Sequence, residues 1–184
     1  EYMLLRPREQ KIWDDTRKWL DSNSENKMMF VIDEAHMYRG SAGGEVSDVK
    51  KVVSPVLVNN EKTTLYHIDF SFDQLRLGGS AFAQSLNKVG DDVPTVQNPE
   101  YFRDAFLAVQ ELVNKGLILA GHDISAGGLI TTLLEMCFAN TEGGMEINLD
   151  KIKCDDIVKI LFAENPGVVI QVADKHKAEV KKIL

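Results

Sequence analysis

The stretch that most constrains this chain is the octapeptide HDISAGGL at residues 122–129. A short apolar run at 117–120 precedes it and an apolar segment with helical spacing at 129–139 follows it, which predicts a turn from a strand into a helix. Such a turn offers free backbone N–H groups and the positive end of a helix dipole. Asp123 and Ser125 add a carboxylate and a hydroxyl. The residues alone leave two alternatives. The turn is either a site that binds both phosphate and a metal ion, or the glycine-rich N-cap of an ordinary helix.

Three further motifs accompany this octapeptide in a fixed order. Between about residue 48 and residue 184 the chain contains LGGSA at 77–81, EMCFA at 135–139 and FAENPGVVIQV at 162–172. Together with HDISAGGL, they resemble the motifs of the formylglycinamidine ribonucleotide synthases, the amidoligases of purine biosynthesis. The resemblance implies an α/β domain with a mixed sheet packed against helices, like the C-terminal domain of the aminoimidazole ribonucleotide synthetase family.

Hydrophobic periodicity in the same region predicts alternating strands and helices. The Asn98 cap followed by Pro99 is a clear helix start. We expect strands at 56–58, 65–70, 117–120, 145–149 and 168–172, and helices at 77–88, 99–116, 129–139, 157–162 and 175–184. This alternation predicts a layered α/β fold.

Composition sets outer limits on function. The 184 residues are 44% hydrophobic and 27% charged, enough for one core or one core with a small appendage. The net charge of −7 argues against a general nucleic-acid clamp, which needs a surplus of Lys and Arg.

No apolar run approaches the roughly 20 residues that span a bilayer, and no signal-peptide pattern occurs, so we expect a cytoplasmic protein. Cys137 and Cys154 lack the spacing of a zinc site or a disulfide framework.

The first fifty residues have a different character. Residues 1–27 have helical spacing, and MMFVIDEAH at 28–36 reads as an apolar strand with carboxylates at its end. This stretch resembles the Walker B, or DEAH, box of superfamily 2 helicases, which implies that Asp33 serves magnesium and Glu34 positions the attacking water. The chain contains no P-loop GxxxxGK[ST] to hold a triphosphate. The alternative is one more strand with a polar end.

We therefore predict two domains. Residues 1–46 are expected to form a helicase-like fragment without helicase activity, a small helix-plus-strand appendage that ends in a linker. Residues 47–184 are expected to form the synthase-like domain.

The amidoligase resemblance implies roles for the residues of the central turn. Asp123 takes the place of a magnesium ligand, and Ser125 with the backbone of Gly127 and Gly128 takes the place of contacts to nucleotide phosphates. His122 either contacts substrate or locks the turn by hydrogen bonds. The chain departs from many relatives at position 126, where it has Ala in place of Asp, so any role of that carboxylate is lost.

The earlier glycine pair repeats the same arrangement of strand, glycines and helix. By resemblance, Gly78, Gly79 and Ser80 lie near the ligand cleft. The alternative is that Ser80 simply caps the following helix.

The resemblance implies an ATP-dependent reaction with Mg²⁺ and ATP or ADP as cofactors. In that reaction formylglycinamide ribonucleotide, glutamine and ATP give formylglycinamidine ribonucleotide, ADP, phosphate and glutamate. The expected partners are the ATP-binding and glutaminase domains of the same synthase, so this chain is predicted not to turn over by itself. Two other functions stay open, a fragment of a nucleic-acid-dependent ATPase and a structural module without enzymatic activity.

Overall fold

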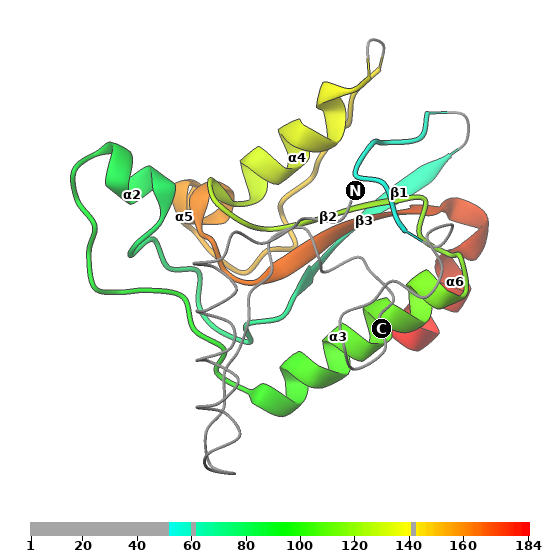
Figure 1. Ribbon diagram of the computed structural model, residues 1–184, viewed down its shortest axis with the longest axis horizontal. Coiled ribbons are helices and arrows are strands. Elements are labelled where there is room, and N and C mark those ends of the chain that lie inside the picture. Colours follow the sequence, from blue (N-terminus) through cyan, green and yellow to red (C-terminus); the bar gives the residue numbers. More distant parts are fainter. Residues whose placement is uncertain (1–51, 60–61, 141–142) are drawn as a thin grey trace, which may run out of the picture. The chain divides into compact units, whose positions relative to one another are not determined.

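A computed structural model describes residues 52–59, 62–140 and 143–184 (Figure 1). In this part of the chain, strands and helices alternate as the hydrophobic pattern predicts. In chain order they are β1 (Thr63–Asp69), α2 (Ala81–Ser85), α3 (Pro99–Asn114), β2 (Ala120–Asp123), α4 (Gly128–Phe138), α5 (Ile157–Phe162), β3 (Gly167–Ala173), a 3₁₀ turn (Asp174–His176) and α6 (Lys177–Ile183).

Strand β3 lies at the centre of a three-stranded sheet with the order β1-β3-β2. It pairs antiparallel with β1, where Tyr66 lies opposite Ile170, and antiparallel with β2, where His122 lies opposite Val169. All seven residues of β3 are buried. This explains why β-branched residues dominate its sequence, because a strand covered on both faces has no polar alternation.

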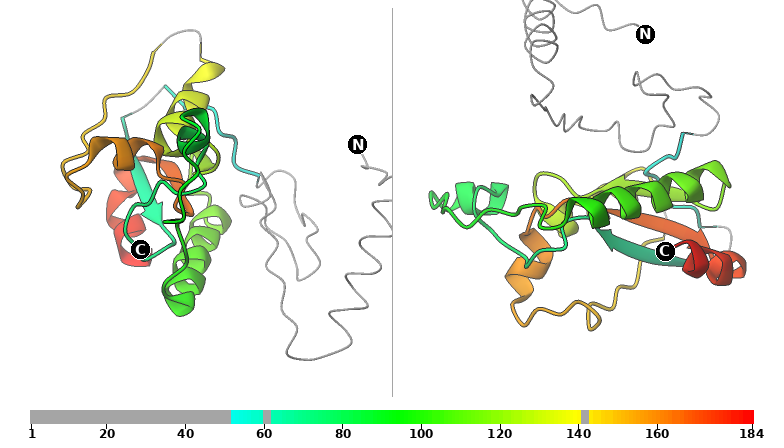
Figure 2. Two further views of the ribbon diagram at one scale, coloured as in Figure 1. Left: turned by 90° about the vertical axis from the view of Figure 1, so that its left-hand side faces the viewer. Right: turned by 90° about the horizontal axis from the view of Figure 1, so that it is seen from below.

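Helices cover both faces of the sheet (Figures 1 and 2). Val168, Ile170 and Val172 of β3 point into one core, which α3 and α6 complete with residues such as Leu112 and Val180. Val169 points to the opposite core, which α4 and α5 complete. The layered α/β class predicted from the sequence is therefore confirmed.

Gln171 is the polar exception among the residues of β3. Its side chain is buried on the α4 side, where Oε1 accepts from the Val58 N–H at 2.8 Å and Nε2 donates to the Val58 carbonyl at 2.9 Å. A buried amide with its hydrogen bonds satisfied avoids the desolvation penalty of an unpaired group. The Gln171 side chain therefore makes the backbone hydrogen bonds to Val58 that a neighbouring strand would otherwise make.

Several predicted elements differ from those observed. The expected strands at 56–58 and 145–149 do not form ladders, and Val58 instead bonds to the Gln171 side chain. The strand expected at 117–120 starts later, because the Leu117 N–H bonds back to Leu112 at the end of α3. We expected a mixed sheet, but the two neighbouring pairs in the described part are both antiparallel.

The predicted appendage at residues 1–46, with Asp33 and Glu34, lies outside the described residues, as does its boundary with the synthase-like domain. Among the described residues, no helix has both the length and the apolar character that a membrane crossing requires.

Helix α3 provides a matched test of the core. Leu112 is fully buried, whereas Leu107 on the same helix is 56% exposed. We expect Leu112→Ala to lower the free energy of unfolding by about 2–5 kcal/mol through lost burial and a residual cavity. Leu107→Ala should change it by less than about 0.5 kcal/mol. Urea denaturation measures both values, and equal losses would contradict the assignment of this face to the core.

Candidate functional site

Asp123 is the last residue of β2, at the point where the chain leaves the sheet. The peptide group that follows its Cα atom is bonded at both ends, because the Ile124 N–H donates to the Gly167 carbonyl at 2.8 Å and the buried Thr132 hydroxyl donates to the Asp123 carbonyl at 2.8 Å. The Asp123 side chain keeps 16% of its surface exposed. The carboxylate is therefore held at a fixed place with limited access to solvent.

His122 lies between two carboxylates. Its Nδ1 atom is 3.0 Å from Asp123 Oδ1 and 2.9 Å from the Asp123 carbonyl oxygen, and its Nε2 atom is 3.3 Å from Glu135 Oε2. The hydrogen bond to the Asp123 side chain raises the pKa of His122, and the nearby Glu135 charge adds to this against the opposing effect of burial. These are the contacts that His122 would make if its role is to lock the turn by hydrogen bonds.

The turn between β2 and α4 depends on its glycine pair. Gly127 is the N-cap of α4 with φ +92°, and Gly128 has φ +72°. A Cβ atom on Gly128 would lie 2.7 Å from the carbonyl carbon of Phe162 in α5, so the start of α4 packs directly on the end of α5. The Gly128 N–H donates to the Ser125 carbonyl at 3.0 Å. Glycine is needed at position 128 for both its conformation and this close approach.

The earlier glycine pair forms a second turn. The Gly78 N–H donates to the Asp92 carbonyl and the Gly79 N–H to the Val89 carbonyl, which closes the loop after α2 back onto the turn. Ser80 is buried and caps α2, since its Oγ accepts from the Ala83 N–H at 3.1 Å. The capping alternative therefore describes Ser80, and contact of this loop with a ligand stays a prediction.

One carboxylate joins the two turns. Glu164 Oε1 accepts from the Gly127 N–H and from the Ala81 N–H, both at 2.8 Å. Next to it, Phe162 of α5 stacks on Phe82 of α2 with ring centroids 4.6 Å apart, and Figure 1 shows these two helices side by side. The structure thus brings together two motifs that are far apart in sequence, LGGSA and HDISAGGL.

Sequence reasoning missed Glu164 as a site residue. It lies in the FAENPGVVIQV motif, in the loop between α5 and β3. Neither periodicity nor spacing in the sequence indicates which backbone amides a carboxylate in such a loop will bind. The neighbouring Asn165 was missed for the same reason. It is 4% exposed, and its amide donates to Ser71 Oγ and to the Gln74 carbonyl, both at 3.1 Å.

The segment leading to the turn at 77–81 is fixed by a polar network around Asp73. Its carboxylate accepts from the Arg76 guanidinium at 2.9 Å and from the Gln74 N–H at 2.7 Å, and Arg76 also pairs with Asp92. Burial by itself would raise the pKa of the Asp73 carboxyl, but the hydrogen bonds from Arg76, Gln74 and Thr95 outweigh it and lower the pKa to about 2.

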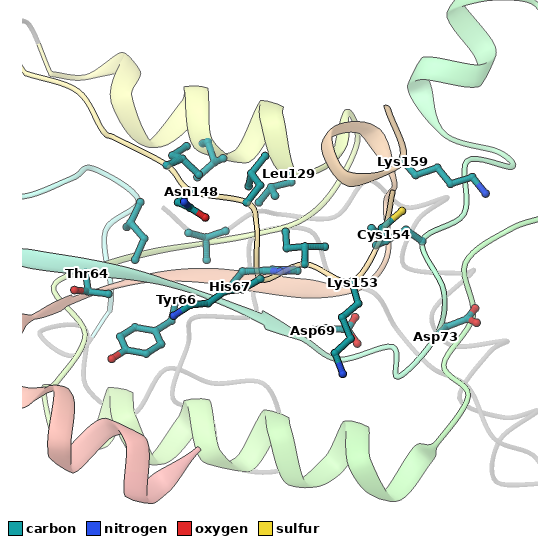
Figure 3. Close-up of a pocket in the computed structure, with 18 of the residues that line it drawn as sticks. Thr64, Tyr66, His67, Asp69, Asp73, Leu129, Asn148, Lys153, Cys154 and Lys159 are labelled. Carbon is teal, nitrogen blue, oxygen red and sulfur yellow. The ribbon is translucent and has the colours of Figure 1, made fainter. Parts of the chain in front are cut away.

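A large groove lies elsewhere in the described part of the chain. It is a groove of about 1050 Å³ around the edge of β1, and residues from both faces of that strand, such as Tyr66 and His67, line it (Figure 3). Its charged lining residues are Asp69, Asp73, Lys151, Lys153, Lys159, Lys177 and Lys181. None of the predicted site residues that the structure describes lines this groove, and no motif in the sequence indicated it.

The described residues contain no group of three His, Cys, Asp or Glu side chains that could hold a metal ion by themselves. Asp123 provides one hard carboxylate at the predicted turn. This fits magnesium, which binds through one or two carboxylates together with phosphate oxygens and water rather than within a cage of protein ligands.

A family comparison matches most of the described residues. Residues 65–184 match the family described as AIR synthase related protein, C-terminal domain. The match covers more than half of the 184 residues, so the chain belongs to this family.

Similar proteins confirm the resemblance that the four motifs predict. The chain is 40% identical over 148 residues to a probable phosphoribosylformylglycinamidine synthase of Caenorhabditis elegans, a match over 73% of this chain and 11% of that protein. It is 37% identical over 143 residues to the phosphoribosylformylglycinamidine synthase of Homo sapiens, over 77% of this chain and 10% of that protein. The chain spans about a tenth of the length of these relatives.

A solved structure shares the fold. PurL of T. maritima complexed with FGAR superposes on 73% of this chain and 23% of that chain with a TM-score of 0.51, at 15% sequence identity. At this identity the likeness shows the fold alone.

The packing of α4 on α5 can be tested with two glycines. Gly116 has φ +65°, but a Cβ atom added there would meet no atom within 4 Å, whereas Gly128 combines φ +72° with the contact to Phe162. We expect Gly116→Ala to cost about 1 kcal/mol of unfolding free energy through backbone strain alone. Gly128→Ala should cost at least about 2–3 kcal/mol. Thermal and urea unfolding compare them, and equal costs would contradict the close contact.

The low pKa of Asp73 predicts a pH dependence. Because its folded pKa of about 2 lies below the ordinary 3.8, its contribution to stability is complete above about pH 4 and is lost as the pH falls toward 2. The unfolding free energies of the unaltered chain and Asp73→Asn should therefore converge over this range. Asp155→Asn, at an exposed position, is the control. A difference that does not change with pH would contradict the assignment.

Proposed function

We propose that this chain is part of the synthetase half of a phosphoribosylformylglycinamidine synthase, and that its turn from β2 into α4 holds a magnesium-bound nucleotide. The observation that carries the proposal is the Asp123 carboxylate, held at the end of β2, from which the turn at 124–127 leads into α4. Membership of the AIR synthase related family and the names of the relatives support the same assignment.

Each residue of the turn has a distinct proposed role. Asp123 would provide a carboxylate oxygen to Mg²⁺, whose charge would offset that of the nucleotide phosphates. Ser125 would donate its hydroxyl to a phosphate oxygen, and the N-terminus of α4 would favour negative charge there. His122 would hold the Asp123 carboxylate in its orientation through the 3.0 Å contact.

The two glycines shape this turn. The N–H groups of Gly127 and Gly128 already donate to Glu164 and to the Ser125 carbonyl. A phosphate contact through these amides, which the family resemblance implies, would have to share or replace those bonds. We therefore assign direct phosphate contact first to Ser125.

The whole reaction needs more than this chain. It consumes formylglycinamide ribonucleotide, glutamine and ATP, and the relatives that carry its name are about ten times longer than the matched segment. We propose that the other ATP-binding domain and the glutaminase domain come from the remaining length of such a protein, and that this segment binds nucleotide but does not turn over alone. A cytoplasmic location belongs to the same proposal.

Calorimetric titration with Mg²⁺ and ADP tests the site. The unaltered chain should bind, and Asp123→Asn should weaken binding roughly 10–100-fold or more, because it removes the charged ligand with little change in shape. Asp155→Asn, an equal charge change at an exposed position, should bind like the unaltered chain. Equal affinity of the Asp123 variant would show that the turn does not hold the metal. No binding by the unaltered chain would contradict nucleotide binding by this segment alone.

A further inference from the structure

Glu164 occupies a specific place between the two turns. It lies in the short connection between α5 and β3, and its Oε1 atom is 2.8 Å from the amide nitrogen of Ala81 and 2.8 Å from that of Gly127. Ala81 is the first residue of α2, and Gly127 is the N-cap of α4. A single oxygen atom thus accepts hydrogen bonds from the starts of two different helices.

The chemistry of this contact favours a carboxylate. The N–H groups at the start of a helix have no acceptor within the helix. A negative charge at a helix N-terminus is stabilising, and hydrogen bonds to an ionised acceptor are stronger than neutral ones. Because one oxygen binds both amides, movement of either turn disturbs the other.

Neighbouring contacts hold the same two segments together. Phe162 stacks on Phe82 of α2, and Asn165 accepts from the Arg76 N–H at 3.3 Å while donating to Ser71 Oγ. The connection from α5 to β3 therefore fixes residues 71–81 from both ends. Among these contacts, the Glu164 bond reaches the turn that carries Asp123 and Ser125.

We propose that Glu164 is a positioning residue of the nucleotide site. It holds the turn at 77–81 against the turn at 124–128, so that both border one site, and it acts through the two amides without touching the nucleotide. This inference rests on the proposed function for its nucleotide part. The coupling of the two turns can be measured without any nucleotide.

Three substitutions of Glu164 distinguish the loss of its hydrogen bonds from a general loss of stability. Glu164→Gln keeps an acceptor oxygen at the same reach. Glu164→Asp keeps the charge but shortens the side chain, and Glu164→Ala removes the acceptor. Glu146→Ala, at an exposed position outside both turns, matches the charge change of the alanine variant.

The first measurement is backbone amide hydrogen exchange by NMR without nucleotide. Exchange at Ala81 and at Gly127 should accelerate together, by about tenfold or more, in Glu164→Ala and Glu164→Asp. It should accelerate less in Glu164→Gln, which keeps the acceptor oxygen without the charge, and should stay near the unaltered rate in Glu146→Ala. Acceleration at neither amide, or at one only, would overturn the proposal. If Glu164→Ala does not fold, Glu164→Asp against Glu164→Gln decides the question.

The second measurement is Mg²⁺–ADP affinity by calorimetry. Glu164→Ala and Glu164→Asp should bind about tenfold more weakly, and Glu164→Gln should be within about threefold of the unaltered chain. Faster exchange at both amides with unchanged affinity would overturn the role at the nucleotide site. If the unaltered chain does not bind Mg²⁺–ADP, the proposed function fails, and the exchange data alone decide whether Glu164 couples the turns.

Discussion

The fold depends on the burial of β3 on both faces and at both edges. Its side chains fill two separate cores, and its backbone pairs with β1 on one side and β2 on the other. A strand in this position tolerates few polar residues, and the one it has, Gln171, bonds to the backbone of Val58. The end of β2, where Asp123 lies, is therefore placed by a strand that has almost no freedom to shift.

The residues just before β3 connect this central strand to the candidate site. Glu164 binds backbone amides of both glycine turns, and Asn165 binds the Gln74 carbonyl in the segment that leads to the turn at 77–81. Gly167, the first residue of β3, approaches the Ile68 carbonyl so closely that a Cβ atom would lie 2.7 Å from its oxygen. A short motif thus combines a tight entry into the sheet with the contacts that arrange the loops.

Much of the fold could be predicted from the sequence, because it follows from local patterns. Asn98 and Pro99 define the start of α3, and the apolar face of that helix forms part of the core. The β-branched run at 168–172 becomes β3. The pattern failed at 145–149, where apolar residues pack on the α4 core without joining the sheet. Alternation of apolar and polar residues indicates which side chains are buried, but it does not indicate which strand the segment pairs with.

The candidate site could be predicted only in part. The turn at 122–129 has a local signature of strand, glycine pair and helix, so its position followed from the residues. The contacts of Glu164 join segments that are far apart in the sequence, and a single sequence does not show which segments pair. The contacts of Glu135 and Thr132 depend on how α4 packs back on the end of β2, which the local pattern does not specify either. The groove around β1 is formed in the same way, by elements brought together only in the folded chain.

The charge of that groove has a consequence for association between molecules. Beyond β1 the sheet has no further strand among the described residues, and such an edge is a template on which another chain can pair. Five lysines against two aspartates line the groove around this edge. Two copies that approached edge to edge would bring like charges together, and this repulsion, which salt weakens, opposes their aggregation through β1.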